Sequence, residues 1–181
     1  MTKEEQVYTL IQGKASSNEF LQGLSGILGF PFTLMVDASV IFTHYGPMLN
    51  QIRTIYGRKP LNSQVIKPIL DGCKSEIIAD LVVDKVVGQI PLVGIAANIM
   101  CAKTMTWRLG ILFGMLAAKG EDFTSENTRN AMIAIRCLFP QKSMVTFTTP
   151  SIDIVKKLLC KLEDTSTDDF NTKCCKIIDA V

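Results

Sequence analysis

Apolar residues recur along most of this chain at the three- and four-residue spacing that places them on one face of an α-helix. The densest run extends from Val86 to Ala118, where Lys103 and Arg108 are the only charged residues. A second long run, from Thr33 to Tyr56, has the same spacing on both sides of Gly46-Pro47, where we expect a kink. The two runs predict two long apolar helices that form the core of the fold.

Local signals mark where the other helices begin and end. Thr2 and Glu5 have the spacing of a capping box, which predicts a first helix that ends at Gly13. Gly57 is expected to end the second long helix, and Asn62 or Ser63 to cap the helix that follows it. Further helices are expected over residues 16–28, 124–139, 150–162 and 170–180, with Pro150 in the first turn of the third.

These elements predict an all-α fold, a compact bundle of roughly six to eight helices. The β-branched stretch 145–149 has no partner strand in the sequence, so we expect it to be an extended loop. At 181 residues, the chain has the length of a single helical domain, 1–181.

The sequence leaves open whether lipid or protein covers the densest apolar run. A membrane-spanning helix needs about 20 consecutive apolar residues. Pro91, Asn98, Lys103 and Arg108 divide the run into shorter pieces. We therefore expect a turn from Pro91 to Gly94, followed by a helix rich in small residues.

The spacing Gly110-x-x-x-Gly114-x-x-x-Ala118 places small residues on one face of that helix. Such a face lets a second helix approach closely, either in lipid or in a tight protein core. The motif itself predicts no particular partner; we expect the helix as a whole to pack closely against the helix that carries Asp37.

Asp37 and His44 are the candidate ionisable residues of the apolar segments. If Asp37 is buried, it needs a donor such as Tyr56 or Thr33, or it is protonated. It is either a packing carboxylate or a functional ionisable group. His44 is the single imidazole, so every histidine-based mechanism would require it, but a structural histidine fits the sequence better. No nucleophile motif or phosphate-binding loop accompanies them, so the sequence predicts no enzyme.

The composition excludes several classes of partner and cofactor. The net charge is +2 and no basic stripe carries interleaved aromatics, so nucleic acid is not an expected partner. The six cysteines form no C-x-x-C, which predicts reduced thiols and neither a metal site nor a cofactor. Cys174 and Cys175 are either acylated or ordinary thiols.

The N-terminus lacks the pattern of a signal peptide, so we expect a cytoplasmic protein. The C-terminal helices are mildly basic, which suits an anionic lipid surface or a solvated helix face. Their lysines are Lys156, Lys157, Lys161, Lys173 and Lys176.

A set of spaced motifs resembles the YcjF-type domain of unknown function, which occurs in bacterial membrane-associated proteins and at the C-terminus of some GTPases. The resemblance covers about residues 23–118, and residues 124–181 form a C-terminal helical extension outside it. This chain has Leu92 where the family has a turn glycine and Val36 where it has a small residue. The motifs are Gly29–Asp37, Met48–Ile52, Ile55–Gly57 and Ile90–Gly94, followed by Asn98, Thr104 and Leu109-Gly110.

The resemblance implies an all-helical, often membrane-associated module without established catalysis. We therefore expect a non-enzymatic module that docks on, or partly into, the cytoplasmic leaflet. The alternative is a soluble helical interaction module that binds a GTPase or a second copy of itself. The candidate structural or functional residues are Asp37, Tyr56, Gly57, Pro91, Gly94, Gly110 and Gly114.

Overall fold

A computed structural model describes residues 1–17, 38–72, 91–120, 132, 135 and 148–162. In this part of the chain all regular structure is helical, and no strand occurs. The helices are α1 (Lys3–Ser16), α3 (Ala38–Ile55), a helix over residues 63–72, α5 (Pro91–Lys119) and α7 (Ile152–Leu162). The expectation of an all-α fold is therefore confirmed for the described residues.

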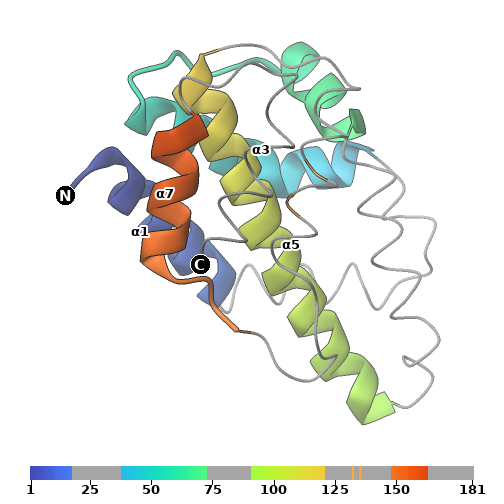
Figure 1. Cartoon of the computed structure of the whole chain (residues 1–181). Helices are drawn as coiled ribbons and strands as arrows, with labels where there is room; N and C mark the ends of the chain where they lie inside the picture. The colour runs from blue at the N-terminus through green and yellow to red at the C-terminus, as the bar shows by residue number, and fades with distance from the viewer. Residues whose placement is uncertain (18–37, 73–90, 121–131, 133–134, 136–147, 163–181) are drawn as a thin grey trace.

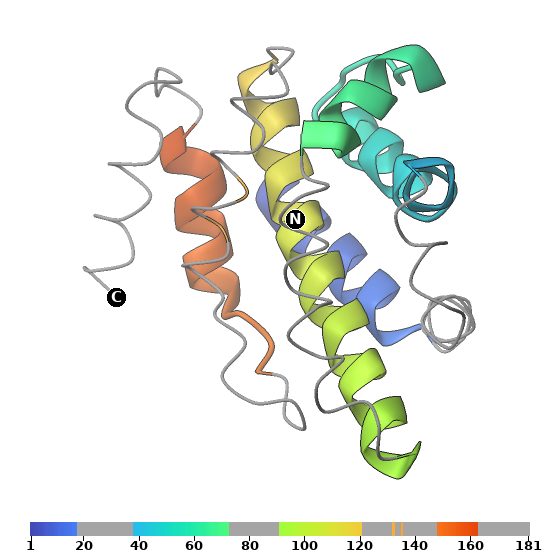
Figure 2. The same cartoon turned by 90° about the vertical axis from the view of Figure 1, so that its right-hand side faces the viewer.

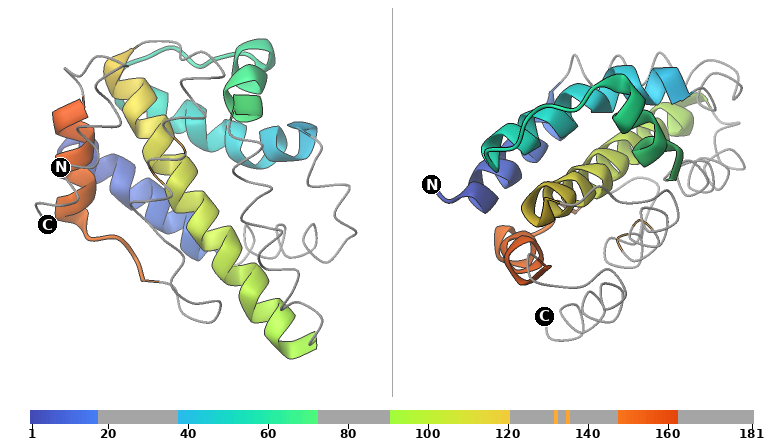
Figure 3. Two further views of the ribbon diagram at one scale, coloured as in Figure 1. Left: turned by 45° about the vertical axis from the view of Figure 1, so that its right-hand side comes forward. Right: turned by 90° about the horizontal axis from the view of Figure 1, so that it is seen from above.

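Helix α5 is the central element (Figure 1). It packs against α1, α3 and α7, and α1 also contacts α3 and α7. Figure 2 shows α7 on one side of α5 and α3, with the helix over residues 63–72, on the other. Seen from above, α1 lies between the α3 and α7 sides (Figure 3). The first turns of α5 extend beyond the other described helices (Figure 1).

Every residue of α5 from Thr104 to Ala118 is buried. A helix that is apolar on all sides requires cover on all sides, and for this half of α5 the cover is protein. None of the described helices combines the length and the apolar character needed to cross a membrane.

Three expected helix ends agree with the structure, and Gly120 ends α5 in the way that Gly57 ends α3. Thr2 and Glu5 form the capping box of α1: the Thr2 backbone N–H donates to Glu5 Oε2 at 2.9 Å and the Glu5 N–H donates to Thr2 Oγ1 at 3.3 Å. Gly57 and Gly120 both have φ of 70°, so they end α3 and α5 in the left-handed region. Asn62 caps the helix over residues 63–72, since its Oδ1 accepts from the Val65 N–H at 3.1 Å.

Three other boundaries were wrong. Helix α1 continues past Gly13 to Ser16 because Ala15 is buried one turn beyond Ile11 on the same face. Pro91 begins α5 directly, so the expected turn from Pro91 to Gly94 is helix. A proline is tolerated there because the first turn needs no backbone donor.

The third correction concerns Pro150, which was expected in the first turn of its helix. Helix α7 begins two residues later, at Ile152. The N-cap is Ser151, whose Oγ accepts from the Ile154 N–H at 3.2 Å. Pro150 precedes the cap, and its carbonyl accepts a hydrogen bond from the Tyr8 hydroxyl at 3.0 Å.

Helix α3 continues on both sides of Pro47. Of the helix expected over residues 124–139, Met132 and Ile135 are described, and both are helical and fully buried. The helices expected over residues 16–28 and 170–180, and the extended loop over 145–149, fall mostly or wholly outside the described residues.

Candidate functional site

The glycine face of α5 lies against α1 and α7. A Cβ added at Gly110 would lie 2.5 Å from Ile11 Cγ1, and one added at Gly114 would lie 2.8 Å from Leu159 Cδ2 and 3.4 Å from Val7 Cγ1. The small residues therefore allow close approach, as the spacing predicted. Helix α3, the helix expected to carry Asp37, packs against α5 as expected, while the two glycines themselves face α1 and α7.

Two polar side chains, one from α3 and one from α5, lie where these helices meet. Tyr45 and Thr106 are both buried and share a hydrogen bond. Burial raises the pKa of Tyr45 far above its ordinary value of 10.0, so this phenol stays protonated. His44 is half-buried beside it, and desolvation lowers the pKa of its imidazole below 6.5. At neutral pH, His44 is therefore a neutral side chain of the α3 surface.

Arg108 is the one charged residue in the fully buried half of α5, with 2% of its surface exposed. In the sequence, this guanidinium counted against a membrane span, because a charge in hydrocarbon is costly. In the structure it lies within the protein. A guanidinium buried there requires acceptors around it.

Several hydrogen bonds fix the turn after α3. The Gly57 N–H donates to the Thr54 carbonyl and the Arg58 N–H donates to the Arg53 carbonyl, both at 2.9 Å. This pair of bonds is a Schellman motif, which explains why Gly57 stands at this position. The sequence-predicted residues Tyr56 and Gly57 therefore mark the end of a helix.

Two side chains of α3 hold the chain after that turn. Asn50 accepts from the Leu61 N–H at 2.8 Å and donates to the Leu61 carbonyl at 3.1 Å. Arg53 Nε donates to the Lys59 carbonyl at 2.9 Å. Residues 56–61 are thus fixed against α3 from both ends. Sequence reasoning missed this role of Asn50, because the amide matches its partner only after the turn has folded back.

One lysine of α7 forms an ion pair with α1. Lys156 Nζ donates to Glu5 Oε1 at 2.9 Å, which joins α7 to the first turn of α1. The hydrogen bond with Lys156 is the main cause that lowers the pKa of Glu5, and the same bond raises the pKa of Lys156. Of the expected basic residues, Lys157 is exposed, and Lys173 and Lys176 lie outside the described residues.

Two of the remaining candidates are described. Asp37, Cys174 and Cys175 lie outside the described residues, and Pro91 and Gly94 lie in the first turns of α5. Among the described side chains, no three His, Cys, Asp or Glu come together where they could hold a metal ion.

Comparison with known proteins found no family model, no curated protein and no solved structure that matches this chain. The resemblance to the YcjF-type domain therefore rests on the motif residues of the sequence alone.

Proposed function

We propose that this chain is a non-enzymatic helical module that docks on the cytoplasmic leaflet of a membrane from one side. Its complete fold is proposed to be a compact single-domain bundle of roughly six to eight helices. Two features support association with a membrane. Apolar residues make up 48% of the chain, and its motifs resemble those of a membrane-associated family.

One observation carries the choice of surface docking over insertion. Residues Thr104–Ala118 of α5 are covered by protein on all sides. To place this segment in lipid, the bundle would have to give up the packing of Ile11 and Leu159 against its two glycines. Insertion of Arg108 at the bilayer centre would add roughly 2.5–3.5 kcal/mol on insertion scales.

Fractionation of cells that express the full chain tests this proposal. We expect the protein in the membrane fraction, and we expect alkaline carbonate or high salt to release it without detergent. Release only by detergent would contradict surface docking and favour insertion. A protein found wholly in the soluble fraction, without affinity for vesicles of any composition, would contradict membrane association itself.

The second candidate is a soluble helical module that binds a GTPase or a second copy of itself. The burial of residues 104–118 also favours it, because an apolar segment that protein covers needs no lipid. Light scattering after size-exclusion chromatography without detergent distinguishes the two. A stable homodimer, or a stoichiometric complex with a GTPase, together with no vesicle binding would favour this candidate.

The proposal also states that the chain has no catalytic activity. It rests on the lack of a recognised nucleophile or phosphate-binding motif in the sequence. His44→Ala and Asp37→Asn are the informative variants, because His44 is the single imidazole and Asp37 the charge in the apolar segment. An assayed activity that either variant abolished without unfolding the chain would overturn this statement.

A further inference from the structure

Four cationic residues from α1, α3 and the turn after α3 gather where α3 and α5 end. Contacts between these segments bring them together: Arg53 bonds to the Lys59 carbonyl, the Arg58 guanidinium lies against Gly120, and Lys3 Nζ lies 5.8 Å from the centre of the Tyr56 ring. We call this surface the basic end, and it consists of Lys3, Arg53, Arg58 and Lys59; the Nζ of Lys119, in the last turn of α5, is buried.

Helix stability accounts for only part of the basic end. Arg53 stands in the last turn of α3, where a positive charge complements the negative end of the helix dipole. Lys3 stands at the opposite, positive end of its own helix, where a cation is unfavourable. Arg58 and Lys59 lie beyond α3, and they are exposed, as is Lys3.

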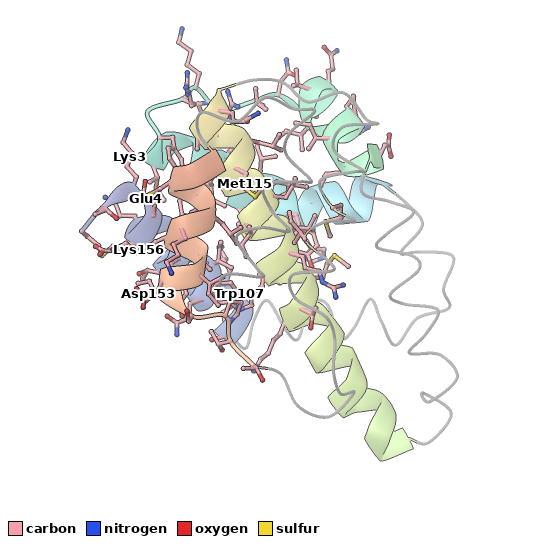
Figure 4. The ribbon with its side chains drawn as sticks, viewed as in Figure 1. Lys3, Glu4, Trp107, Met115, Asp153 and Lys156 are labelled. Carbon is pink, nitrogen blue, oxygen red and sulfur yellow. The ribbon has the colours of Figure 1, made fainter. Side chains whose placement is uncertain are left out.

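The described acidic residues of α1 do not neutralise this surface. Glu5 is paired with Lys156, and Glu4 acts on the same lysine. Figure 4 shows Glu4, Asp153 and Lys156 along the side where α1 meets α7, while Lys3 points toward the end of the molecule where α5 finishes. Two further acids, Glu121 and Asp122, follow Gly120 in the sequence and lie outside the described residues.

We propose that the basic end is the surface that docks on the membrane, and that it recognises the anionic headgroups of phospholipids. This inference rests on the proposed function and names its contact surface. The turn that carries Arg58 and Lys59 is fixed by the Gly57 motif and by Asn50, so the two charges are held outward without further loss of backbone entropy. Attraction to an anionic leaflet adds up over such charges within a Debye length of the surface.

The same features favour a lipid surface over nucleic acid. Proteins that bind single-stranded nucleic acid add exposed aromatic rings to their cations. The aromatic ring at the basic end, Tyr56, is partly buried with Lys3 over it. The net charge of the whole chain is only +2, so the positive potential is local to this end.

Vesicle co-sedimentation of the full chain tests the inference. One set of vesicles contains phosphatidylcholine mixed with phosphatidylglycerol, and the other contains phosphatidylcholine alone. The test variant is Arg58→Gln/Lys59→Gln. The matched control is Lys67→Gln/Lys157→Gln, which removes two exposed lysines from the helix over residues 63–72 and from α7.

We expect the unchanged chain to bind the anionic vesicles, and added salt to weaken that binding. The test variant is expected to bind roughly 25-fold more weakly, at about fivefold per charge near the surface. The control is expected to bind like the unchanged chain. Circular dichroism and the midpoint of thermal unfolding verify that both variants fold.

Three results would overturn the inference and leave surface docking standing: equal binding to both kinds of vesicle, unchanged binding of the test variant, or an equal loss in the control. The first result would mean apolar docking, and the last would mean that net charge matters but its location does not. If the chain bound neither kind of vesicle, or bound only a nucleic acid probe, the inference and the proposed function would both fail.

Discussion

Gly110 and Gly114 of α5 have no side chain, so two neighbouring helices approach closely at these positions. Ile11 of α1 fills the space above Gly110, and Leu159 of α7 fills the space above Gly114. Both side chains are almost fully buried. The glycine spacing in the sequence predicted a close approach, but nothing in the local pattern could identify Ile11 or Leu159 as the residues that use it.

We expect Gly110→Ala to destabilise the protein. The new Cβ would lie 2.5 and 2.7 Å from two carbons of the Ile11 side chain, so one helix must move. Overpacking of this kind costs about 1–3 kcal/mol, and the higher helix propensity of alanine offsets up to about 1 kcal/mol. Urea unfolding, followed by circular dichroism, measures the difference in the free energy of unfolding.

Gly13→Ala is the matched control, because Gly13 also lies inside a helix but has nothing within 4 Å of the position of a new Cβ. Here only the helix propensity changes, so the variant should be more stable by about 0.5–1 kcal/mol. Stabilisation by both alanines would show that α1 is not seated on Gly110 in solution.

At the scale of elements, α1 is held by one carboxylate that serves two purposes. Glu5 Oε2 accepts from the Thr2 N–H and completes the capping box, while Glu5 Oε1 accepts from Lys156 of α7. The sequence predicted the first interaction, because its two residues are three apart. It could not predict the second, which joins residues 151 positions apart and exists only after α1 and α7 have packed together.

The pairing makes stability depend on pH in a defined direction. The folded pKa of Glu5 is lowered from 4.5, so its stabilisation is complete above 4.5 and is lost as the pH falls through the folded value. Lys156 has a pKa raised from 10.5, so its contribution is complete below 10.5 and is lost as the pH rises through the folded value. Between these limits the contribution of the pair is constant.

We expect Glu5→Gln to lower stability near neutral pH, and the difference from the unchanged chain to shrink as the pH falls below 4.5. Unfolding by urea at a series of pH values measures that difference. Glu4→Gln removes the neighbouring carboxylate from the same turn and serves as the control. A difference for Glu5→Gln that stayed the same down to the lowest pH would mean that the charge of Glu5 is not involved.

The turn after α3 depends on the amide of Asn50 in a comparable way. Asn50→Ala removes two hydrogen bonds and leaves both backbone groups of Leu61 without their partner. We expect a loss of about 1–3 kcal/mol in the free energy of unfolding and faster amide hydrogen exchange at Leu61. Gln51→Ala, at the neighbouring exposed position, is expected to change stability by less than about 0.5 kcal/mol.

At the scale of the whole molecule, Trp107 reports on the packing of the bundle. Its side chain is 1% exposed, and its ring centroid lies 5.1 Å from that of Tyr8, at an interplanar angle of 56°. Tyr8 in turn donates to the carbonyl of Pro150, just before α7. The one tryptophan of the chain therefore lies where α1, α5 and the start of α7 meet.

We expect the fluorescence of Trp107 to show the short emission wavelength of a buried indole and weak quenching by iodide or acrylamide. Unfolding should shift the emission to longer wavelength in the same transition that circular dichroism reports, if the bundle unfolds as one unit. Tyr8→Ala is expected to increase quenching, because it removes the ring that covers Trp107. Strong quenching in the unchanged chain would contradict the packing of α1 on α5.

How far the sequence could predict this protein depends on the distance between interacting residues. The capping box at Thr2, the glycine that ends α3 and the cap at Asn62 were found because each relies on hydrogen bonds within about one helical turn. The end of α1 and the start of α5 were misplaced. Helix α1 continues past Gly13, which would usually end a helix, because Ala15 is buried. Helix α5 begins at Pro91, which would usually interrupt a helix, because a first turn tolerates proline.

By itself, the sequence determined the helical class, the main stop signals and the need to cover a long apolar segment, because these follow from local hydrogen bonding and apolar periodicity. Only the tertiary structure decided what covers that segment: protein surrounds residues 104–118, with α1 and α7 seated on the glycines. The basic end likewise required folding, since it combines Lys3 of α1 with Arg53, Arg58 and Lys59. The physical reason is that both depend on contacts between residues far apart in the chain, whose free energy exists only in the packed bundle.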